Sequence, residues 1–115
     1  MALSEQQVGA CLPKSAVGMN DTAQVISSVP VTIYGWHIKN RVAAATWIQL
    51  FNAASASGIT LGTTVADFVI GIDSSGKIEC SQAKPMFFSA GLVAYSTSSA
   101  SNNTAALSDG VFFYA

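Results

Sequence analysis

The sequence predicts an all-β protein, an antiparallel β-sandwich or jelly-roll-like barrel of about seven or eight strands. Short segments rich in β-branched and aromatic residues recur along the chain, and Gly, Pro, Asn and Ser separate them. No segment keeps the 3.6-residue apolar period of a long amphipathic helix. These observations favour two packed sheets over any helical architecture.

The first 21 residues show no sustained period and are expected to form an N-terminal arm, followed by a β-sandwich domain over residues 22–115. Residues 22–28 are a candidate first strand that Pro30 ends. The clearest strand starts at Val31, because apolar and polar residues alternate from there. Strict alternation would place Val31, Ile33, Gly35 and His37 on one face, and Thr32, Tyr34, Trp36 and Ile38 on the other.

Residues 45–53 have the composition of a further strand, with Trp47, Gln49 and Phe51 opposite Ile48 and Leu50. A short helix is the alternative, because three alanines precede Thr46. Short strands are also expected over residues 59–61, 65–72, 91–97 and 110–114. The spacing of Asp73 and Gly76 predicts a tight turn, which would make residues 77–80 the hairpin partner of residues 65–72.

The surface is expected to carry few charges. A chain of 115 residues is the size of one domain, with an accessible surface of roughly 6,000 Å². Five Lys or Arg and six Asp or Glu serve that surface, whereas an average chain of this length would have about 29 charged residues. With a net charge of −1 and no basic cluster, nucleic-acid binding is not expected.

Two pairs of consecutive aromatic residues point to exposed apolar side chains. Phe87-Phe88 and Phe112-Phe113 each put one ring on either side of a strand. One ring of each pair therefore lies outside the core unless something covers it. Together with the scarcity of charge, this predicts homo-oligomerisation or capture on a larger assembly.

No motif for catalysis, a cofactor or a metal ion is present. His37 is the one histidine, and an enzyme would need it beside an acidic residue in a pocket. Cys11 and Cys80 lack the spacing of a zinc or redox site, and their pairing stays open. The amino terminus has no secretory signal, so synthesis in a cytoplasm is expected. Polar residues interrupt the uncharged residues 42–66, so no membrane segment is expected.

From residue 33 onwards the chain resembles small virion proteins of tailed bacteriophages, of the head-decoration or cement type. The resemblance lies in YGWHI (34–38), LFNA (50–53), LGTT (61–64), FSAGL (88–92) and FFY (112–114). It implies a β-sandwich on the capsid surface of the virion, often a homotrimer, that bridges neighbouring subunits of the major capsid protein. It also implies that the protein is not an enzyme.

On this interpretation six residues are candidates for the subunit or capsid interface. Three lie in the expected arm and three in the last strands: Leu3, Val8 and Leu12, then Phe87, Phe112 and Tyr114. The alternative is a tail, fibre or head-fibre module that contacts carbohydrate on the host surface. In that case Trp36 and Trp47 are the candidate carbohydrate platform.

Overall fold

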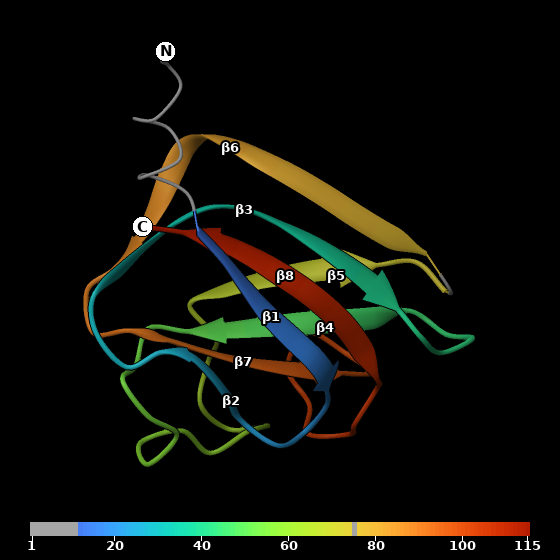
Figure 1. Cartoon of the computed structure of the whole chain (residues 1–115). Coiled ribbons are helices and arrows are strands. Elements are labelled where there is room, and N and C mark those ends of the chain that lie inside the picture. The colour runs from blue at the N-terminus through green and yellow to red at the C-terminus, as the bar shows by residue number, and fades with distance from the viewer. Residues whose placement is uncertain (1–11, 75) are drawn as a thin grey trace.

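Eight β-strands make up the computed structural model, which describes residues 12–74 and 76–115, and of residues 77–84 the backbone alone. The strands are β1 (Leu12–Met19), β2 (Gln24–Ser27), β3 (Val31–Asn40), β4 (Thr46–Phe51), β5 (Phe68–Ile72), β6 (Lys77–Phe88), β7 (Leu92–Thr97) and β8 (Ser108–Tyr114) (Figure 1). No helix occurs in this part of the chain.

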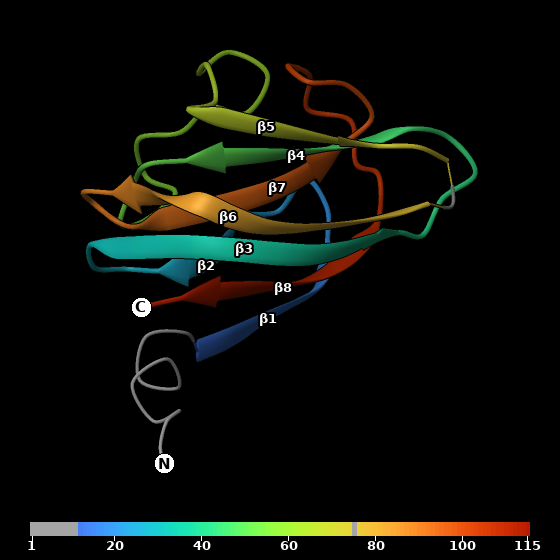
Figure 2. The ribbon, with the colours of Figure 1, turned by 90° about the horizontal axis from the view of Figure 1, so that it is seen from above.

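The strands form two four-stranded antiparallel sheets. Sheet A has the order β1-β8-β3-β6, and sheet B has the order β2-β7-β4-β5. The ladders β1·β8, β2·β7, β3·β6 and β4·β5 are those of one long hairpin, which has been rolled up so that β3 also meets β8 and β4 also meets β7. This is the jelly-roll arrangement, and it confirms the predicted fold class. Figure 2 shows β4 and β5 in one layer and β1, β3 and β8 in the other.

The main core lies between the sheets, where Ile33, Ile38 and Phe112 of sheet A meet Ile48 and Leu50 of sheet B. A second cluster sits on the outer face of sheet B. There Phe51, Val93 and Tyr95 are covered by Ile59 and Leu61 from the connection between β4 and β5. The solvent-accessible surface of 5895 Å² agrees with the value expected from the mass.

A β-bulge changes the phase of β3. The register contains one extra residue between Ile33 and Gly35 relative to β8. An extra residue reverses which side chains point inward beyond it. Trp36 and Ile38 therefore lie in the core, whereas His37 is exposed. The strict alternation predicted for this strand holds up to Ile33 and is wrong beyond it.

Three further expectations need correction. Residues 12–19 are the strand β1, paired with β8, so they belong to the sandwich and not to an arm. Residues 59–61 do not form the expected strand but lie in turns, one of which is closed by hydrogen bonds that the carbonyl oxygen of Thr60 accepts. The turn over residues 73–76 forms, with the N–H of Gly76 donating to the carbonyl of Asp73, but β6 pairs with β3 and not with β5. The turn therefore joins the two sheets. The short-helix alternative for residues 45–53 is excluded, because Thr46–Phe51 form the strand β4.

Candidate interaction surface

The jelly roll brings strand termini together at two opposite ends of the sandwich (Figure 1). The register places the starts of β1, β3, β5 and β7 at one end, together with the terminal residues of β2, β4, β6 and β8. The turns over residues 41–45 and 73–76 lie at the other end. Exposed side chains at the two ends differ in chemistry.

One end collects most of the exposed large hydrophobic side chains among the described residues, and we call it the apolar end. Val29 is 61% exposed in the β2–β3 turn, and Phe87 is 66% exposed on β6. Leu12, Val65 and Phe68 complete it. Exposed apolar residues that gather in one region, unlike single ones, mark contact sites for partners.

Part of the apolar end is a row that crosses all four strands of sheet A. Leu12 is the cross-strand partner of Tyr114. Thr32 is the partner of Phe87, and it exchanges two backbone hydrogen bonds with Ala115, of 3.0 and 3.1 Å. The hydrogen-bonded ladders of sheet A therefore hold Leu12 and Phe87 at the same end of its two edge strands.

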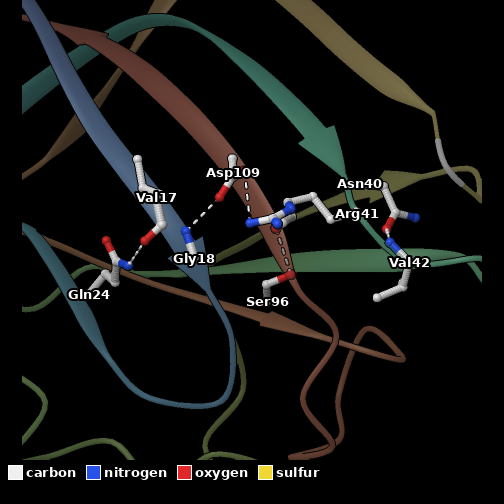
Figure 3. A network of polar contacts seen from close by, with 9 residues as sticks. Val17, Gly18, Gln24, Asn40, Arg41, Val42, Ser96 and Asp109 are labelled. Atoms are coloured by element: carbon white, nitrogen blue, oxygen red, sulfur yellow. Dashed lines mark hydrogen bonds and ion pairs between the residues drawn. The ribbon is translucent and has the colours of Figure 1, made fainter.

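The opposite end carries most of the charged side chains that the structure describes, and we call it the charged end. Arg41 and Asp109 form an ion pair of 3.3 Å there, and Asp109 also accepts a hydrogen bond of 2.6 Å from the N–H of Gly18 (Figure 3). Lys39, Asp73 and Asp21 lie in the same region. Among the described charged side chains, those nearer the apolar end are Lys14 and Asp67.

The predicted interface residues divide into three groups. Leu12 and Phe87 are exposed at the apolar end, and Tyr114, the cross-strand partner of Leu12, is half-buried. Phe112 is 0% exposed and packs between the sheets, so it is removed from the candidate surface. Its neighbour Phe113 is the half-buried ring of that pair. Leu3 and Val8 lie outside the described residues.

The structure places the two candidate platform residues in different environments. Trp36 is 5% exposed, with its ring centroid 5.9 Å from that of Phe68 inside the sandwich. It therefore presents no surface to a ligand, because the bulge in β3 turns it inward. Trp47 is half-buried on the outer face of sheet B.

Sequence reasoning missed Val29, Val65 and Phe68 as members of this surface. Val29 stands in a turn beside Pro30, and a hydrophobic residue in a turn was the available signal. Val65 was assigned to a strand, but β5 begins at Phe68 and leaves Val65 in the preceding connection. In the same connection the Asp67 carboxylate accepts a hydrogen bond of 2.7 Å from the N–H of Asn52.

His37 and Asp67 lie on different sheets, and the acidic residue that the register places opposite His37 is Glu79 of β6. His37 is exposed on β3 of sheet A, whereas Asp67 precedes β5 of sheet B. Cys11 and the side chain of Cys80 lie outside the description. Among the described residues, no helix is long and apolar enough to span a bilayer. No protein-family model, curated protein or solved structure matches the chain.

Proposed function

We propose that the protein is a structural virion component, a capsid decoration or cement protein that binds the outside of a phage head and bridges neighbouring capsid subunits. It acts without catalysis, as a homo-oligomer for which a trimer is favoured. The observation that carries the proposal is the separation of the two ends. The apolar end is suited to burial against the shell and sister copies, and the charged end is suited to water.

The fold and the sequence resemblance support the same role. Jelly rolls of two four-stranded sheets recur in viral capsid proteins and lectins. A fold alone does not define a function, but here the surface adds to it. The resemblance of residues 33–115 to small virion proteins points to the head.

The mechanism of stabilisation is physical. A ligand that binds only the assembled shell stabilises that state by mass action, by about 2.7 kcal/mol when its free concentration is a hundred times its dissociation constant. A copy that contacts two capsid subunits also resists their separation. Each bound copy therefore opposes disassembly of the head.

Polar substitutions at the apolar end test the site of attachment. The double variant Val29→Thr/Phe87→Thr should weaken binding to purified undecorated heads by roughly a hundredfold or more, because burying each such side chain stabilises by roughly 1.5–3 kcal/mol. The matched control is Val17→Thr, since Val17 is 69% exposed but lies at the other end of β1. Cosedimentation with heads gives the affinities, and circular dichroism checks the fold.

If the double variant and the control bind heads equally well, attachment does not use the apolar end. Sedimentation equilibrium of the free protein tests the oligomer. A reversible trimer is the expected species. A stable monomer at high concentration contradicts that part of the proposal.

A further inference from the structure

Trp47 occupies an unusual position on the outer face of sheet B. Its cross-strand neighbours are Thr97 on β7 and Gly71 on β5. The β4–β5 connection covers Phe51 and Tyr95 on this face, but Trp47 lies at the other end of β4 and stays half-buried. A large aromatic side chain therefore remains accessible near the charged end.

The indole lies flat on the backbone of Gly71. An ideal Cβ atom on Gly71 would be 2.7 Å from Cζ3 of Trp47, and 3.1 Å from both Cε3 and Cη2, the ring atoms bonded to Cζ3. A Cβ atom that lay in the ring plane, beyond the ring edge, would be farther from Cε3 and Cη2 than this. Because the three distances are nearly equal, the Cβ position of Gly71 lies above the plane of the Trp47 ring. The opposite face of the ring is therefore turned away from the sheet.

The surroundings of the ring are rigid and polar. Gln49, the next residue on the same face of β4, donates hydrogen bonds of 2.8 Å to Oγ1 of Thr97 and 3.0 Å to the carbonyl of Asn102. These bonds fasten the loop over residues 98–104 to the outer face of β4, the strand that carries Trp47. The loop carries exposed hydroxyl and amide side chains at Ser98, Ser101, Asn103 and Thr104.

The strands that carry the platform contain no charged residue, and the nearest charge along β5 is the carboxylate of Asp73, directly after its last residue. None of the four strands of sheet B contains Asp, Glu, Lys, Arg or His. An ionic ligand would leave water here without a counter-charge on these strands, which is costly. A nucleic acid would find no cation for its phosphates. The ligand that matches is neutral, with one apolar face and hydroxyl groups at its edge.

We propose that Trp47 is the stacking platform of a binding site for neutral carbohydrate, with the loop over residues 98–104 contacting the hydroxyl groups at the edge of a pyranose ring. The C–H groups on one face of a pyranose pack against the electron-rich face of the indole. Gly71 is required because any side chain there would lift the ring. This site lies away from the apolar end and does not depend on the proposed attachment to heads.

The test uses the full-length protein coupled to beads at high density, so that many copies act together and weak single-site affinities are detected. The beads are applied to an array of neutral glucose, galactose, mannose and N-acetylglucosamine oligomers, with sialylated and sulfated glycans beside them. Binding to neutral oligomers is expected. Trp47→Ala should reduce it by roughly tenfold or more, as loss of about 1.4 kcal/mol would, and Trp47→Phe should retain part of it.

A second variant leaves the tryptophan in place. Gly71→Ala should weaken glycan binding, because the added methyl group would stand 2.7 Å from the ring and displace it. Phe87→Thr is the control at the apolar end and should leave glycan binding unchanged. Conversely, Trp47→Ala should leave cosedimentation with heads unchanged, so the two proposals fail separately.

Two results would overturn this site. One is an array on which the wild-type protein binds no neutral glycan. The other is neutral-glycan binding that persists at full strength in both Trp47→Ala and Gly71→Ala.

Discussion

Tyr95 is the residue at which burial should be visible as a pH dependence. It packs edge-on against Phe51, with the ring centroids 5.5 Å apart, under the β4–β5 connection. Burial raises the pKa of Tyr95. A phenol in the unfolded chain ionises near pH 10, so above that pH the unfolded state releases its proton first and gains stability relative to the folded state.

The wild-type protein should therefore lose more stability than Tyr95→Phe as the pH rises from 9 through 11. Below the unfolded-state pKa this contribution is complete, and it disappears as the pH passes the folded-state pKa. Urea unfolding of both proteins at pH 8, 9, 10 and 11 measures the difference, and the shared titration of the lysines cancels. Parallel losses in the two proteins would show that Tyr95 is not the source.

At the scale of elements, Asn40 joins the two turns at which the chain changes sheet. It is fully buried, and its amide nitrogen donates to the carbonyls of Ala44, at 2.7 Å, and Asp73, at 3.0 Å. Its Oδ1 accepts from the hydroxyl of Thr46 and the N–H of Val42. One side chain thus fixes the turns over residues 41–45 and 73–76 together.

Asn40→Ala should destabilise the protein by about 2–4 kcal/mol, because it leaves the buried hydroxyl of Thr46 and three partly buried backbone groups without their partner. Asn52→Ala is the matched control. Asn52 bonds two groups, Ser89 and the N–H of Ala90, but it is exposed, so water replaces it at a cost of less than about 1 kcal/mol. Urea denaturation gives both values, and equal losses would contradict the role assigned to burial.

Most strands could be predicted from the sequence because their local composition determines them. The β-branched and aromatic composition, bounded by turn residues, identifies β3, β4, β7 and β8 within a few residues. Two features escaped local reasoning. The bulge in β3 has no distinctive residue signal, yet it decides that Trp36 is buried and His37 is exposed. The Asp73–Gly76 spacing predicts the turn, but which sheet the next strand joins depends on long-range pairing.

Only part of the candidate surface could be predicted from the sequence, because the fold of the whole molecule decides which residues come together. Phe87 could be recognised because consecutive aromatic residues must divide between two faces of a strand. That logic could not decide which ring of the 112–113 pair points inward. Nor could it show that Leu12 and Phe87 lie at the same end, because 75 positions separate them in the chain. The rolled-up hairpin brings Leu12 and Phe87 to the same end of sheet A.

Separation of the apolar and charged ends predicts how salt affects attachment. Contacts between ion pairs weaken as salt screens them, whereas apolar burial is strengthened by sulfate. Attachment to heads should therefore persist from 0.05 to 0.5 M NaCl and tighten in ammonium sulfate, relative to NaCl of equal ionic strength. Cosedimentation measures it. A steep decline with NaCl would mean that charged residues dominate the contact.

The same separation affects how the isolated particle meets any boundary between water and a less polar phase. A particle that is apolar at one end and charged at the other is amphipathic, so it adsorbs at such a boundary in the way that a surfactant does. In a thin aqueous film, such as one prepared for electron microscopy, molecules should stand with Val29 and Phe87 toward the air and Arg41 and Asp109 toward the liquid. Images of the free protein would then show a strongly preferred orientation, which a detergent added before freezing should relieve.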